Sequence, residues 1–384
     1  MSAQLPEFHD QIITGSPGTS VHDLLLDHTK IGWYPDLIAA WQRGERIAPV
    51  TIDWALTRKC NYACEFCYAM LQENERKEQT KDIAFHFLDD CAEIGVRGVS
   101  LISDGESTVH PDYVEVIEHG AKVGLSMGVG SNGLLLKRRV LQEILPCLHY
   151  LRFNFSAGEQ GRYAEIMGAK SDWFRVVIQN IKDAMEIKRR DNLQCTINLQ
   201  MVVMPKYADQ ILPLTRLAIE IKPDYLIFKH CADDSRHQLG VDYEQYDECI
   251  PLLKEAEQLG KDNGLHVAVK WSRLDGVRTY SRCYGPPFIM QVSGSGLVAP
   301  CGFLFNERYK KFHIGNIVDQ RFKDIWASDR YWDVMKYLAS DEFDPRKRCG
   351  PNCLQHTTNT YLFDHLHRGA PLPEGNPPPH LGFL

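Results

Sequence analysis

CNYACEFC, the stretch at residues 60–67, places three cysteines on one short segment, directly after a strand-like run at residues 50–56. A four-iron, four-sulfur cluster that is held completely by protein takes four cysteine thiolates. Thiolates at Cys60, Cys64 and Cys67 would leave one iron open, much as a catalytic zinc keeps one position free of protein ligands. The spacing therefore predicts an iron–sulfur site that carries out chemistry.

The C-x3-C-x2-C spacing, with Phe66 before the last cysteine, resembles the cluster-binding motif of the radical SAM enzymes. The resemblance implies a [4Fe-4S] cluster with an open iron site that binds S-adenosylmethionine. It also implies reductive cleavage of that cofactor to a 5′-deoxyadenosyl radical, which abstracts a hydrogen atom from a substrate. A zinc site and three structural thiols are the alternatives, but zinc motifs usually show paired C-x2-C units and no second pair lies nearby.

The region from residue 50 to residue 270 alternates apolar strand-like runs with amphipathic stretches. Strands are expected at residues 51–56, 98–103, 127–131, 150–156, 196–203 and 225–229, and a further apolar run lies at 265–270. Helices are expected at residues 81–94, 112–123, 137–145, 171–190, 209–221 and 243–263. Strands separated by helices indicate parallel β/α units. The expected fold class is α/β, and six such units match the partial (β/α)6 TIM-like barrel that the resemblance to radical SAM enzymes implies. Barrel enzymes place their chemistry at the C-terminal ends of the strands.

The rest of the chain divides into three further parts. Residues 1–49 are expected to form an N-terminal preface with a short helix at 34–43, and residues 361–384 a proline-rich tail without regular structure. Residues 271–360 are expected to form a small α+β extension. Its expected elements are a hairpin around a glycine-bearing turn, at 288–292 and 297–300, and helices at 322–327 and 331–338.

A second set of four cysteines lies in this extension. Cys283 and Cys301 flank the hairpin, and Cys349 and Cys353 follow the last expected helix. Four thiols are enough to hold a four-iron cluster completely. The order Cys283, Gly296, Cys301 resembles the SPASM and twitch extensions of radical SAM enzymes. No cysteine follows Cys353, so the resemblance implies one auxiliary [4Fe-4S] cluster; a zinc knuckle is the alternative.

Polar residues at the expected strand ends are candidates for the cofactor pocket. Asp104, Gly105 and Glu106 take the place of the Gly-Gly-Glu-Pro motif that receives the SAM amino group in the radical SAM family. Asp104 stands for the first glycine. A carboxylate can pair with an ammonium group, and a glycine permits its close approach. The resemblance also implies contacts from Phe66, Asn132, Asn154, Ser156 and Arg162, with Ser156 favoured over Asn154 for the ribose. An exposed arginine on a helix is the alternative for Arg162.

Candidate reaction residues follow the sixth expected strand. Lys229, His230 and Asp233 are candidate bases or substrate contacts, and Cys231 is a candidate hydrogen-atom donor. An inert buried thiol is the alternative for Cys231. Two outcomes fit: an oxidation in which the auxiliary cluster accepts an electron, or an epimerisation in which Cys231 quenches the substrate radical.

The expected substrate is a small polar or sugar-like metabolite, because the 49-residue preface is short for a peptide-recognition domain. Modification of a ribosomally made peptide is the second hypothesis. A non-catalytic iron–sulfur electron carrier is a hypothesis of another class, and the open site argues against it because a carrier gains nothing from an unligated iron.

Composition limits the partners. The 384 residues are 44% hydrophobic and 24% charged, as in ordinary globular proteins. The net charge of −7 offers no broad attraction for nucleic acid. No apolar run of about 18 residues and no signal-peptide pattern is present, so no membrane partner is expected. The 12 cysteines then indicate metal ligands in the reducing cytoplasm. Besides the substrate, the expected partner is an electron donor such as flavodoxin or ferredoxin.

Overall fold

One curved sheet organises the protein. The computed structural model describes residues 28–234, 236–271, 278–350 and 352–384. Within these ranges a ten-stranded sheet has the order β10-β9-β8-β1-β2-β3-β4-β5-β6-β7. Its strands are β1 Thr51–Trp54, β2 Gly98–Leu101, β3 Ser126–Ser131, β4 Leu148–Asn154, β5 Thr196–Val203, β6 Tyr225–His230, β7 His266–Val269, β8 Ile289–Val292, β9 Leu297–Ala299 and β10 Gly315–Asn316.

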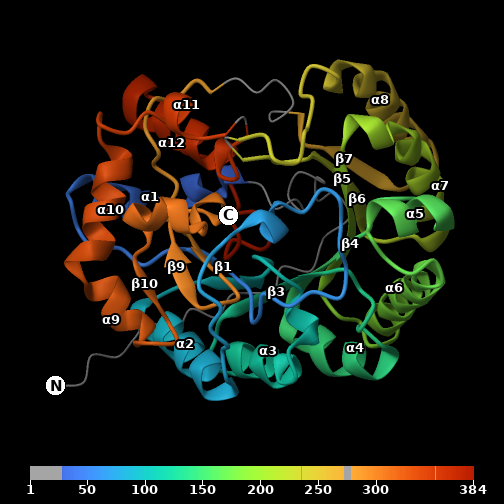
Figure 1. Ribbon diagram of the computed structural model, residues 1–384, viewed down its shortest axis with the longest axis horizontal. Coiled ribbons are helices and arrows are strands. Elements are labelled where there is room, and N and C mark those ends of the chain that lie inside the picture. Colours follow the sequence, from blue (N-terminus) through green and yellow to red (C-terminus); the bar gives the residue numbers. More distant parts are fainter. Residues whose placement is uncertain (1–27, 235, 272–277, 351) are drawn as a thin grey trace.

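Strands β1 to β7 run parallel to their neighbours, and helices lie around the outside of this curved part (Figure 1). These helices are α2 Lys81–Ile94, α3 Tyr113–Lys122, α4 Arg138–Ile144, α5 Gln160–Ile166, α6 Trp173–Arg190, α7 Ile211–Ile221 and α8 Tyr246–Asp262. The remaining helices are α1 Pro35–Gln42, α9 Phe322–Ala327, α10 Asp329–Ala339, α11 Pro345–Arg348 and α12 His356–Arg368. The expectation of an α/β fold built from parallel β/α units is confirmed.

Local sequence explains the most regular elements. Helix α2 begins where the Thr80 side chain accepts a hydrogen bond from the Ile83 amide, and it ends at Gly95, whose φ of 99° is left-handed. It buries Phe87 and Leu88 against the sheet. Every residue of β5 is buried, as a strand in the middle of a covered parallel sheet requires.

The C-terminal extension grows out of the barrel sheet. Strand β8 pairs in parallel with β1, while β9 and β10 continue from it as an antiparallel meander. The extension is therefore hydrogen-bonded directly to the first barrel strand. No helix in the described ranges combines the length and the apolar character needed to cross a lipid bilayer.

The last residues differ from the expected unstructured tail. Helix α12 reaches Arg368, and the chain then returns to the centre of the ring of strands (Figure 1). Thr51 Oγ1 donates to the Gly382 carbonyl at 2.9 Å and accepts from the Leu384 amide at 2.9 Å. Phe383 is 1% exposed and meets the ring of Tyr150 edge to face. Burial of these apolar side chains offsets the cost of ordering the segment, a signal that the proline-rich composition hides.

Candidate cofactor and substrate site

A cavity of ≈ 280 Å³ lies within the curved sheet and reaches both cysteine sets. Cys60, Cys64 and Cys67 border it on the barrel side, and Cys353 borders it on the side of the extension. Polar walls come from the barrel strands, and Phe383 and Leu384 also line it. One cavity therefore touches both predicted cluster sites.

The three cysteines of the first loop lie close together. Burial raises the pKa of each thiol, and neighbouring thiols contribute to the rise at Cys60, whose pKa is about 11, and at Cys64. Buried thiols of this kind become thiolates when a bound metal supplies the compensating positive charge. The donor set and its mutual proximity fit a [4Fe-4S] cluster with one iron left without a cysteine.

Contacts with the neighbouring β/α unit hold this loop in place. The Tyr62 hydroxyl lies 2.9 Å from the Tyr163 hydroxyl, and the Tyr62 ring stacks on Trp173 with centroids 5.2 Å apart. The Glu65 carboxylate accepts from Lys206 Nζ at 2.6 Å. The loop is thus supported by buried aromatic packing on one side and an ion pair on the other.

The predicted cofactor loop after β2 contributes Gly105 and Glu106 to the cavity wall. Glu106 Oε2 accepts from the Asn132 amide at 2.7 Å, and Asn132 Nδ2 donates to Asn61 Oδ1 at 2.7 Å. Burial raises the pKa of Glu106. The cysteine loop, the loop after β2 and the end of β3 are therefore joined by hydrogen bonds around one wall, where an ammonium group would find a carboxylate.

The structure brings only part of the predicted set together. Phe66, Asn154, Lys229 and His230 line the cavity with the residues above. Among the described residues, Asp104, Ser156, Arg162, Cys231 and Asp233 are not part of its lining. Their cofactor and substrate roles stay predictions, which the following contacts do not favour.

Each of these side chains is engaged elsewhere. Ser156 Oγ accepts from the Val202 amide at 3.2 Å, because β4 ends at Asn154 and the alternation expected for Ser156 stops there. Arg162 forms a two-point contact with Asp209. Cys231 Sγ faces the Phe66 carbonyl at 3.7 Å, and burial raises the pKa of this thiol to about 12.

Sequence reasoning missed a polar layer inside the barrel. Its members are strand residues Asp53, Arg152, Gln200 and Gln291, together with Lys270 just after β7. Gln291 Nε2 donates to Asp53 Oδ2 at 2.5 Å, and burial raises the pKa of Asp53 to about 6. The available signal was polar residues at alternate positions of otherwise apolar strands, such as Arg152 and Asn154.

The second cysteine set is also assembled. Burial raises the pKa of Cys283, Cys301 and Cys349, and neighbouring members of the set raise it further. Asn359 Nδ2 donates to Cys353 Sγ at 3.7 Å. No three His, Cys, Asp or Glu side chains in the described ranges converge as they would around a single metal ion. An iron–sulfur cube spreads its cysteine ligands more widely, and four thiols fit it.

Comparisons with known proteins agree with this geometry. Residues 54–218 match the model of the radical SAM superfamily, and residues 283–354 match that of SPASM, an iron–sulfur cluster-binding domain. The chain is therefore a radical SAM protein with a C-terminal SPASM domain. Its cofactors are S-adenosylmethionine, the open [4Fe-4S] cluster and an auxiliary cluster.

The relatives of this chain carry names that describe different reactions. An AdoMet-dependent heme synthase of Methanosarcina barkeri is 26% identical, over 79% of this chain and 88% of its own length. A PqqA peptide cyclase of Bradyrhizobium diazoefficiens is 26% identical, over 55% of each chain. The structure of Streptococcus suis SuiB bound to its precursor peptide SuiA superposes with a TM-score of 0.59 at 17% identity, covering 83% of this chain and 73% of SuiB.

Proposed function

We propose that this radical SAM enzyme oxidises a C–H group of a small polar substrate in the cavity between its two cysteine sets. The observation that carries the proposal is that Cys60, Cys64, Cys67 and Cys353 border one cavity of ≈ 280 Å³. A substrate bound there is next to the site of hydrogen abstraction and next to a ligand of the auxiliary cluster.

The protein's own residues position the substrate and provide a base. When bound, the open cluster and S-adenosylmethionine supply the 5′-deoxyadenosyl radical that takes a hydrogen atom, and the auxiliary cluster supplies an acceptor for one electron. The second hydrogen leaves the substrate as a proton, so a two-electron oxidation needs a base. Asp53 lies in the cavity wall with a pKa of about 6, so it is ionised near neutral pH and suited to that role. Lys229 and His230, at the end of β6, also line the cavity and are the further candidates.

Oxidation is favoured over epimerisation by the position of Cys231. Its thiol faces the Phe66 carbonyl at 3.7 Å, while its neighbours Lys229, His230 and Ala232 line the cavity. A hydrogen-atom donor must reach the substrate carbon. The redox-neutral route therefore lacks a donor at the place where the sequence suggested one.

A small polar substrate is favoured by the shape of the space. The cavity must also receive part of the cofactor, and the segment ending in Phe383 and Leu384 covers it on the side of the N-terminal strand ends. The wall offers charged and amide groups from Asp53, Arg152 and Gln200. Such walls select ligands with several hydrogen-bonding groups.

A peptide substrate is the second candidate, favoured by the relatives that modify peptides. One measurement distinguishes a small-molecule substrate from a peptide substrate. The enzyme is incubated anaerobically with reductant, S-adenosylmethionine and either a small-molecule filtrate of cell extract or a pool of peptides. We expect the filtrate to accelerate 5′-deoxyadenosine formation; acceleration by peptides alone would establish the second candidate.

Reductive cleavage itself tests the proposal against a pure electron carrier. Formation of 5′-deoxyadenosine that is lost in Cys64→Ala supports the enzyme, whereas reversible reduction without loss of S-adenosylmethionine supports the carrier. The wild type should bind about eight irons and Cys353→Ala about four; full iron in Cys353→Ala would remove the auxiliary site. A flavodoxin or ferredoxin as electron donor and a cytoplasmic setting stay predictions.

A further inference from the structure

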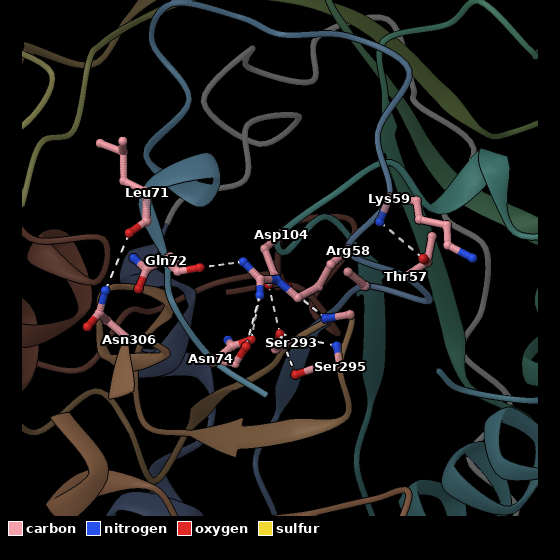
Figure 2. A network of polar contacts seen from close by, with 12 residues as sticks. Thr57, Arg58, Lys59, Leu71, Gln72, Asn74, Asp104, Ser293, Ser295 and Asn306 are labelled. Atoms are coloured by element: carbon pink, nitrogen blue, oxygen red, sulfur yellow. Dashed lines mark hydrogen bonds and ion pairs between the residues drawn. The ribbon is translucent and has the colours of Figure 1, made fainter. Parts of the chain in front are cut away.

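Asp104, which stands where the radical SAM motif has a glycine, is bound to the SPASM domain. Ser293 Oγ donates to its Oδ2 at 2.7 Å, and the Gly294 amide donates to its Oδ1 at 2.7 Å. Arg58 Nε lies 3.2 Å from the same Oδ2 (Figure 2). Asp104 is 3% exposed, so both carboxylate oxygens are used within the protein.

The other nitrogens of Arg58 reach the segment that follows the cysteine loop. Its Nη1 donates to Asn74 Oδ1 at 2.7 Å, and its Nη2 donates to the Gln72 carbonyl (Figure 2). Arg58 stands two residues before Cys60, and Gln72 stands five residues after Cys67. One guanidinium therefore joins the entry and the exit of the cysteine loop to Asp104.

Two glycines lie very close to the backbone of Thr57, which precedes Arg58. A Cβ at Gly105 would stand 2.1 Å from the Thr57 carbonyl oxygen, and a Cβ at Gly294 would stand 2.2 Å from the Thr57 carbonyl carbon. Gly105 belongs to the cofactor loop and Gly294 to the turn between β8 and β9. Both loops press on the peptide that leads into the cysteine loop, and only glycine allows that approach.

We infer that Arg58 and Asp104 are a positioning pair that holds both ends of the cysteine loop against the turn at residues 293–295 of the SPASM domain. A buried carboxylate is stable only when charge and hydrogen bonds satisfy it, and here the satisfying groups come from both domains. A glycine at position 104 could not make this connection. The SPASM domain thus supports the SAM site through the Ser293 hydroxyl and the Gly294 amide. This inference rests on the proposed use of the cysteine loop.

The test compares three variants of the anaerobic holoenzyme. Asp104→Asn removes the charge facing Arg58, and Ser293→Ala removes one hydrogen bond with little risk to folding. Asp90→Asn is the matched control, because Asp90 is a fully buried acid on α2 that pairs with Arg321 of the SPASM domain at 2.5 Å, away from the cysteine loop. Each is measured by amide hydrogen exchange over residues 57–74 and by the change in the reduced cluster's EPR spectrum on adding S-adenosylmethionine.

We expect exchange over residues 57–74 to become roughly tenfold faster in Asp104→Asn, and several-fold faster in Ser293→Ala. The EPR change should be altered in the same order and unaltered in Asp90→Asn. Unchanged exchange in both test variants, or equal changes in the control, would overturn the inference. Because exchange reports on the loop whether or not S-adenosylmethionine is cleaved, failure of the proposed function would be distinguishable.

Discussion

Gln291 Nε2 donates a hydrogen bond to Asp53 Oδ2 at 2.5 Å, and the two residues are direct partners in the β1–β8 register. Asp53 belongs to the barrel, whereas Gln291 belongs to the first strand of the SPASM domain. The second domain therefore supplies part of the wall around the proposed base.

The pH dependence of product formation should follow Asp53. Burial raises the pKa of Asp53 to about 6, and only the ionised carboxylate can accept a proton. Product formation should rise about tenfold per pH unit below this value and level off above it. Gln291→Leu removes a hydrogen bond that lowers the pKa of Asp53, so the midpoint should move to higher pH. A rise that persists unchanged in Asp53→Asn would assign it to another group.

The auxiliary cluster should respond to Asn359. Its side-chain amide donates to Cys353 Sγ at 3.7 Å, and hydrogen bonds to cluster sulfurs help to set the reduction potential. Such a donor stabilises the reduced, more negative cluster, so Asn359→Ala should make the auxiliary potential more negative. An EPR-monitored redox titration measures it, with Asn263→Ala, at an exposed asparagine, as the control. Equal potentials in the wild type and Asn359→Ala would contradict the prediction.

Stability should depend on the tyrosine pair behind the cysteine loop. Tyr62→Phe leaves the Tyr163 hydroxyl buried without its partner at 2.9 Å, which should lower the free energy of unfolding by about 1–2 kcal/mol. Anaerobic urea denaturation measures the loss. Tyr361→Phe, whose hydroxyl bond is exposed, should change little; a similar loss there would show that the effect is not specific to the pair.

Substitution of Cys231 should leave turnover close to the wild-type value. The buried thiol faces the Phe66 carbonyl at 3.7 Å, and Cys231 is not among the residues that line the cavity. Product formation by Cys231→Ala in D2O should equal that of the wild type. A loss of solvent deuterium from the product, with S-adenosylmethionine cleavage retained, would restore the hydrogen-donor hypothesis.

The aromatic side chain near the end of the chain should contribute strongly to stability. Phe383 is 1% exposed, and Phe383→Ala should cost about 3 kcal/mol or more in the free energy of unfolding. Met70→Ala, at a side chain that is 61% exposed, is the control for loss of an exposed apolar group. A cost at Phe383 no larger than at Met70 would show that the segment does not pack as described.

Local signals made much of the fold predictable. Helix α2 and strand β5 were expected at their exact bounds, because a cap, a left-handed glycine and apolar residues at alternate positions are all local features. Helix α12 was missed, and so was the place of β8 beside β1, because strand order depends on contacts between distant segments.

The residues of the candidate site were likewise predictable only where the signal was local. Cys60, Cys64 and Cys67 could be predicted as cluster ligands because the ligand type and the spacing lie within one short stretch of sequence. Asp53 and Gln291 were not, because they are far apart in the sequence and meet only through the sheet. Asp104 was assigned by its place in a motif, whereas its contacts depend on residue 58 and on a turn almost two hundred residues away.

The position of Leu384 has a practical consequence for the bench. Its amide is bound to Thr51 and its side chain is 5% exposed, at the base of the strand ring. An affinity tag or fluorescent protein fused after this residue would displace the buried segment or would have to pass between the residues that pack around it. Recombinant versions for spectroscopy should therefore add nothing directly after Leu384.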